Sequence, residues 1–167
     1  RPDVIVEAGS FHGGSAALWA MILEQVNPAG RVVTIDIKDM MVRARQLPVV
    51  QERVDFLLGS STEPRIVQEV ARRVQGKKAL VILDSLHTRD HVLAELRAYS
   101  PLVPVGGYLI VQDTNVNGHP IYPPPVGPGP YEAVEAFLKE NPGFAADKSR
   151  ERMLLTFSPG GYLKRVK

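Results

Sequence analysis

A glycine-containing turn directly follows the first apolar run of the sequence. It spans residues 7–15 and reads Glu-Ala-Gly-Ser-Phe-His-Gly-Gly-Ser. Glycines permit a tight turn and let the backbone approach a ligand closely. The carboxylate of Glu7 would repel a pyrophosphate but suits a ligand with positive charge. S-adenosylmethionine carries a sulfonium and an ammonium and no phosphate, so the Glu-x-Gly-x-x-x-Gly pattern favours it over NAD, whose fingerprint has a different glycine spacing.

Polar residues also follow the second and third apolar runs. Asp36 ends the run 32–35 and can accept two hydrogen bonds from ribose hydroxyls. The Gly-Ser-Ser-Thr segment 59–62, which contains Ser61, follows the third run and could receive the edge of an adenine. The structural alternative is that Gly9 and Gly13 only form the turn and that Ser61 only caps a helix. The three strand ends together favour a cofactor site.

Two further acids suggest a metal site. Asp84 and Asp113 end the fourth and fifth apolar runs, and oxygen ligands from two strand ends, completed by water, suit Mg²⁺. Such an ion could hold two vicinal oxygens of a substrate and lower the pKa of a hydroxyl. His87, three residues after Asp84, could remove the proton. Alternatively, Asp84 caps the next helix and Asp113 orders its own turn.

The elements that must position these residues alternate along the chain. Continuous apolar runs indicate strands buried on both faces of a parallel sheet, at residues 4–6, 32–35, 54–58, 80–83 and 108–111. Helical patterns lie between or after them, at residues 15–26, 64–74, 89–99 and 131–141. This order predicts an open, doubly wound α/β sheet that binds ligands at the carboxyl ends of its strands. Residues 154–166 break the alternation, and we expect an antiparallel strand there.

Composition narrows the class of protein. The chain has 167 residues, a net charge of +2 and 0 Cys, which excludes disulfide scaffolds and thiolate zinc sites. We therefore expect one domain over residues 1–167, in the cytoplasm, with a small-molecule substrate and without nucleic-acid or membrane partners. Because an apolar run begins at Val4, we also expect that a segment preceding it is missing.

A proline-rich loop follows the fifth strand, at residues 117–130. Proline forbids both helix and central strand. Since the loop begins at the ligand-binding edge of the sheet, we interpret it as a cover over the substrate; a plain connector is the alternative.

The residues at 4–15, 83–87, 112–115 and 161–165 together resemble the cephalosporin hydroxylase family, which includes rhamnosyl O-methyltransferases and the protein of cephamycin C methoxylation. The resemblance covers nearly the whole chain. It implies a Rossmann-like class I methyltransferase fold, a three-layer αβα sandwich. Its mostly parallel seven-stranded sheet would have the order 3-2-1-4-5-7-6 and an antiparallel C-terminal strand. It also implies a homo-oligomer and an N-terminal extension that this chain lacks.

The resemblance carries site residues as well. With the turn, it implies that S-adenosylmethionine is bound by Glu7, Gly9, Ser10, Phe11, Gly13, Ser15, Asp36, Ser61 and Asp84. More distant catechol-O-methyltransferase-like enzymes hold Mg²⁺ at positions matching Asp84, Gln112 and Asp113. Family members usually have an acid where this chain has Gln112, so we expect weaker metal binding. His87 and Asp84 are the predicted catalytic residues.

The sequence therefore predicts an S-adenosylmethionine-dependent O-methyltransferase that acts on a hydroxyl of a sugar or small natural product, with Mg²⁺ assisting. Two alternatives remain: an NAD(P)-dependent oxidoreductase, and a cofactor-binding accessory protein without catalysis of its own.

Overall fold

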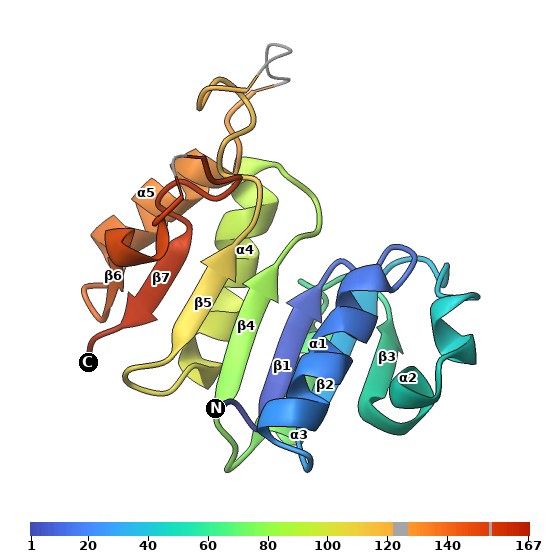
Figure 1. The fold of residues 1–167 in the computed structure, drawn as a ribbon. Coiled ribbons are helices and arrows are strands. Elements are labelled where there is room, and N and C mark those ends of the chain that lie inside the picture. The colour runs from blue at the N-terminus through green and yellow to red at the C-terminus, as the bar shows by residue number, and fades with distance from the viewer. Residues whose placement is uncertain (122–126, 154) are drawn as a thin grey trace.

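The computed structural model describes residues 1–121, 127–153 and 155–167 and contains one seven-stranded sheet (Figure 1). Its strands are β1 Val4–Ala8, β2 Arg31–Asp36, β3 Val54–Leu58, β4 Ala79–Leu83, β5 Tyr108–Val111, β6 Phe144–Ala146 and β7 Tyr162–Arg165. They lie in the order β3-β2-β1-β4-β5-β7-β6. Strands β1 to β5 pair in parallel, whereas β7 runs antiparallel to both β5 and β6. The predicted order and the antiparallel C-terminal strand are confirmed.

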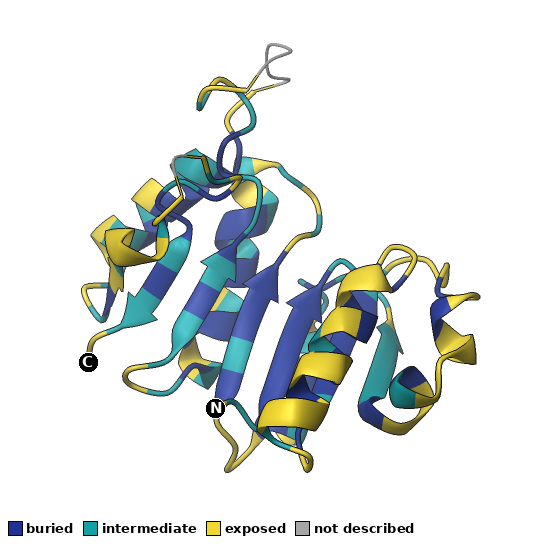
Figure 2. Cartoon of the chain, viewed as in Figure 1, coloured by how far each residue is buried: buried dark blue, intermediate teal, exposed yellow. Residues whose placement is uncertain are grey.

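Helices cover the sheet on both faces, as Figure 1 shows for α1 and α4. The helices are α1 Gly14–Val26, α2 Pro48–Arg53, α3 Pro64–Val74, α4 Arg89–Tyr99 and α5 Pro130–Glu140. One apolar core joins the sheet to α3, α4 and α5, and a second joins it to α1 and α2. Within β1, Val4 and Val6 belong to the first core and Ile5 to the second. Both faces of the strand are thus buried, which explains its continuous apolar sequence (Figure 2).

The predicted strands and helices are present, with shifts of at most two residues at the ends of the five parallel strands and the four predicted helices. Neither α2 nor β6 was predicted from the residue pattern, because six and three residues are too few to show a period. Helix α5 begins one residue early, at Pro130, where the backbone N–H of Gly129 donates to Glu132 Oε2 at 2.7 Å.

The two capping alternatives are wrong. Helix α3 has Glu63 at its N-cap and α4 has Thr88, each without a side-chain cap. Ser61 and Asp84 are therefore free for other roles. Residues 122–126 of the proline-rich loop lie outside the described residues, so the predicted cover over the substrate remains a prediction. In the described part of the chain, no helix is both long and apolar enough to cross a membrane.

Candidate functional site

A cavity of about 940 Å³ opens at the carboxyl ends of β1 to β4. Its lining includes seven predicted cofactor residues: Gly9, Ser10, Phe11, Ser15, Asp36, Ser61 and Asp84. It also includes Gly59 and Ser60 of the segment predicted to receive the adenine, and seven residues that were not predicted: His12, Gly14, Ile35, Ile37, Ser85, Leu86 and His91. Ile37, Ser85 and Leu86 lie within three residues after a strand, so the strand-end rule could have identified them.

Gly9 lets β1 and β4 meet closely at the cavity floor. Its φ of +97° lies in the left-handed region, and its N–H donates to the carbonyl of Ile35 at 2.8 Å. A Cβ placed on it would lie 1.8 Å from the backbone oxygen of Asp84. Only glycine fits here, and the close approach brings the residue after β4 beside the turn.

Asp36 holds the turn in shape. Its Oδ2 accepts the backbone N–H groups of Ser10 at 3.1 Å and Phe11 at 2.9 Å, and its Oδ1 accepts that of Lys38 at 3.0 Å. A carboxylate has about four lone-pair sites, so Asp36 retains acceptor capacity for a ligand in the cavity that it lines.

Glu7 and Gly13 lie behind the cavity rather than in its lining. Glu7 is 1% exposed, and it accepts hydrogen bonds from Thr34 Oγ1 at 2.6 Å and Trp19 Nε1 at 3.2 Å. Burial raises the pKa of Glu7 despite these donors. At Gly13, φ is +78° and a Cβ would lie 2.6 Å from Met41 Cε. A direct contact of Glu7 with a cationic ligand therefore stays a prediction.

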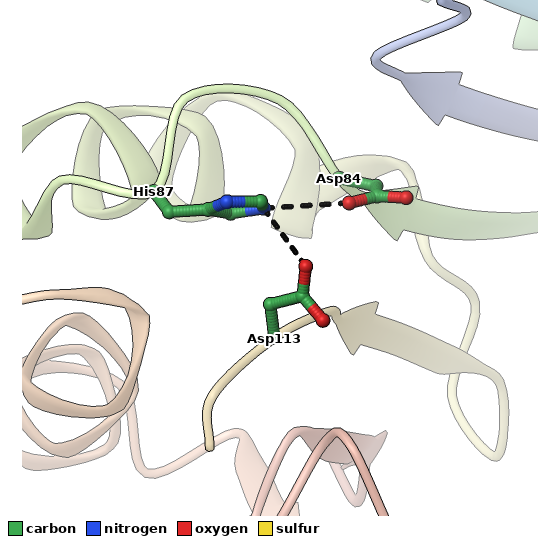
Figure 3. Close-up of side chains that lie close together, drawn as sticks. All are labelled: Asp84, His87 and Asp113. Carbon is green, nitrogen blue, oxygen red and sulfur yellow. Dashed lines mark hydrogen bonds and ion pairs between the residues drawn. The ribbon is translucent and has the colours of Figure 1, made fainter. Parts of the chain in front are cut away.

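Asp84, His87 and Asp113 come together at the ends of β4 and β5 (Figure 3). His87 Nε2 lies 3.4 Å from Asp84 Oδ1 and 3.5 Å from Asp113 Oδ2. The hydrogen bond to Asp84 and the charges of Asp113 and Asp84 raise the pKa of His87, although burial opposes the shift. Burial raises the pKa of Asp113.

This cluster has the composition of a divalent-cation site. One ligand atom from each of the three residues lies within 4.8 Å of the others. Two carboxylates side by side repel each other, and a divalent cation between them relieves that repulsion. Mg²⁺ prefers oxygen ligands, so Asp84 and Asp113 fit it and His87 stays available for a proton.

Gln112, the third predicted metal ligand, is already engaged. Its Oε1 accepts a hydrogen bond from Ser158 Oγ at 3.0 Å. The contact holds the segment before β7 against the end of β5, where Thr114 Oγ1 also donates to the carbonyl of Pro159 at 2.9 Å. A role of Gln112 as metal ligand therefore stays a prediction.

One buried acid at the cavity wall was missed altogether. Glu95 on α4 is 0% exposed and accepts hydrogen bonds from Ser61 Oγ at 2.5 Å and Ser85 Oγ at 2.6 Å. His91 Nε2 lies 3.4 Å from the same carboxylate oxygen. The spacing of His91 and Glu95, four residues apart on a helix, was a signal that they share a face.

The sheet order, the antiparallel β5–β7–β6 end and the cavity at the strand ends define a Rossmann-like class I methyltransferase fold. The family described as Rhamnosyl O-methyltransferase/CmcI matches residues 1–166, and the chain belongs to this family. A rhamnosyl O-methyltransferase of Mycobacterium tuberculosis is 40% identical over 171 residues, covering 99% of this chain and 68% of the relative. One of Mycobacterium leprae is 39% identical, covering 99% and 72%.

Solved structures share the fold at lower identity. A structure of CmcI with Mg and SAM has a TM-score of 0.69 and 18% identity, covering 99% of this chain and 66% of that one. A TDP-rhamnose 3′-O-methyltransferase of calicheamicin biosynthesis has a TM-score of 0.66 and 20% identity, covering 98% and 71%. The methyltransferase MycE of the mycinamycin pathway, with Mg and SAH, has a TM-score of 0.60 and 20% identity. The match covers 83% of this chain and 36% of the MycE chain.

Proposed function

We propose that this chain is an S-adenosylmethionine-dependent O-methyltransferase that acts on a hydroxyl of a sugar or another small natural product, with Mg²⁺ assisting. The observation that carries the proposal is the position of Asp84. It lines the cofactor-sized cavity and also belongs to the Asp84–His87–Asp113 cluster, so the two sites adjoin. The names of the M. tuberculosis and M. leprae relatives support transfer to a rhamnosyl hydroxyl.

The chain's own residues would do three things in this reaction. Asp36 fixes the turn that lines the cavity, and its remaining lone pairs would accept hydrogen bonds from the ribose of a bound cofactor. Because Gly9 has no side chain, the turn can lie directly against the backbone of Asp84. The cavity would thereby position a bound methyl donor toward the acceptor oxygen, and such positioning accounts for a large part of catalysis in group transfer.

Asp84 and Asp113 would hold Mg²⁺, and His87 would take the proton of the acceptor hydroxyl. The bound cofactor supplies a methyl group on a cationic sulfur, and the metal supplies positive charge near the hydroxyl that loses its proton. His87 Nε2 stands 3.4 Å and 3.5 Å from the two carboxylates, so it faces the same space as the acceptor oxygen would.

Two remaining features are proposed with the function. We expect a homo-oligomer, which the family resemblance implies and light scattering can check. We also expect a cytoplasmic enzyme, because a chain with 0 Cys suits a reducing compartment.

Calorimetry with S-adenosylhomocysteine, with and without Mg²⁺, tests cofactor choice, and NADH serves as the competing ligand. We expect binding of S-adenosylhomocysteine and none of NADH. Methyl transfer from labelled S-adenosylmethionine is then measured on a panel of rhamnosides and TDP-rhamnose, with EDTA as the metal control. Binding of NADH alone would replace the proposal with an oxidoreductase. Normal cofactor binding without transfer to any acceptor would favour an accessory protein.

A further inference from the structure

A buried carboxylate lies directly behind one wall of the cavity. Two serines of this wall, Ser61 after β3 and Ser85 after β4, line the cavity. Both donate their hydroxyl protons to the same oxygen, Oε1 of Glu95, at 2.5 Å and 2.6 Å. Glu95 comes from α4, so one side chain ties together two strand ends and a helix.

The second oxygen of Glu95 makes this arrangement costly for stability alone. Oε2 is buried and has no hydrogen-bond partner among the described residues. An unpaired buried polar atom costs free energy, and an apolar side chain of similar size would avoid that cost. A group of this kind therefore indicates a role other than stability.

The role follows from the direction of the hydrogen bonds. A serine hydroxyl has one proton to donate and two lone pairs that accept. Since Ser61 and Ser85 both give their proton to Glu95, only lone pairs are left to face the cavity. His91 Nε2 lies 3.2 Å from Ser61 Oγ and 3.4 Å from Glu95 Oε1, where it can only donate. The serine hydroxyls thus form a surface that accepts hydrogen bonds and donates none.

We propose that Glu95 is a positioning residue that fixes this polarity and makes the wall select a 6-aminopurine over a 6-oxopurine. The inference rests on the proposed function, because it takes the cavity as the S-adenosylmethionine site. The 6-amino group of adenine donates hydrogen bonds and matches the lone pairs of Ser61 and Ser85. Hypoxanthine has a carbonyl oxygen at the same place, which would face lone pairs and leave them unpaired.

The test compares S-adenosylhomocysteine with S-inosylhomocysteine, which has a carbonyl oxygen at C6 and a proton on N1, by calorimetry on the whole chain. The wild-type protein should prefer the adenosyl ligand by about a hundredfold, the effect of two mismatched hydrogen bonds. In Glu95→Leu both serines lose the oxygen that accepts their protons, so these protons are free to turn toward the cavity. The preference should fall below about tenfold. Asp90→Leu makes a similar change on the same helix at a side chain 90% exposed, and should keep the full preference.

Three results separate the possible failures. Wild-type protein that binds S-adenosylhomocysteine without preferring it, or Glu95→Leu with an undiminished preference, overturns the Glu95 inference and leaves the proposed function standing. Wild-type protein that binds neither ligand overturns both. Should Glu95→Leu not fold in circular dichroism, Ser85→Ala decides: it keeps Glu95 but removes one acceptor, and a preference unchanged from wild type overturns the inference.

Discussion

Replacing Gly9 with alanine tests the close contact on which the cavity depends. The new Cβ would lie 1.8 Å from the Asp84 carbonyl oxygen, although Cβ contacts below 3.0 Å essentially never occur. The Asp84 carbonyl must move by about 1 Å, because the close packing of the sheet prevents the new Cβ from shifting instead. Two backbone hydrogen bonds lie at this junction, from Gly9 N to Ile35 O and from Asp84 N to Ala8 O, each 2.8 Å long.

The cost can be worked out from these contacts. Straining two hydrogen bonds costs about 1–3 kcal/mol each, and a left-handed φ on alanine adds about 1–2 kcal/mol. We therefore expect Gly9→Ala to lose about 3–8 kcal/mol of unfolding free energy, much of the ~5–15 kcal/mol of an ordinary domain.

Urea denaturation followed by circular dichroism measures this loss, with Gly14→Ala as the matched control. Gly14 is the first residue of α1, and a Cβ there meets nothing within 4 Å. Because alanine favours a helix, the control should gain about 0.5 kcal/mol or stay unchanged. A Gly9→Ala protein within about 1 kcal/mol of wild type would refute the argument that the turn excludes a side chain.

Three further substitutions address the site. Asp36→Ala removes the acceptor of three backbone N–H groups, so calorimetry should show S-adenosylhomocysteine binding weakened by about 1–3 kcal/mol; unchanged affinity would place the ribose elsewhere. Asp84→Asn should abolish any dependence of methyl transfer on Mg²⁺ while sparing cofactor affinity, and failure of either half contradicts the metal assignment. Glu7→Gln tests the buried acid through pH. Because burial raises the pKa of Glu7, the folded wild type binds its proton more tightly than the unfolded chain does. Its stability should therefore decline as pH rises from the ordinary glutamate pKa to the raised one. This decline should be absent in Glu7→Gln, and urea titrations in which both proteins follow the same pH course would contradict it.

Much of the fold was predictable because its signals are local. Strand β4 is apolar throughout and β1 begins with the apolar run 4–6, since both faces of these strands are buried. A parallel sheet then brings every strand end to one edge, so Asp84 and Asp113 could be placed together without knowing any distance. The order of the strands was not predicted from local signals. It came from the family resemblance, because periodicity alone does not specify which strands are neighbours.

The sequence by itself determined the strand-end residues Gly9, Asp36, Asp84 and Asp113, because the position of each depends only on where a strand stops. Only the tertiary structure decided which side chains touch. Ser61 and Glu95 are 34 residues apart, and Gln112 and Ser158 are 46 apart, in elements with no local pattern that links them. The same holds for Glu7, whose carboxylate accepts a hydrogen bond from Trp19 on α1, a contact that depends on how α1 packs on the sheet. Side-chain partners across elements follow from packing, and packing is a property of the whole folded chain.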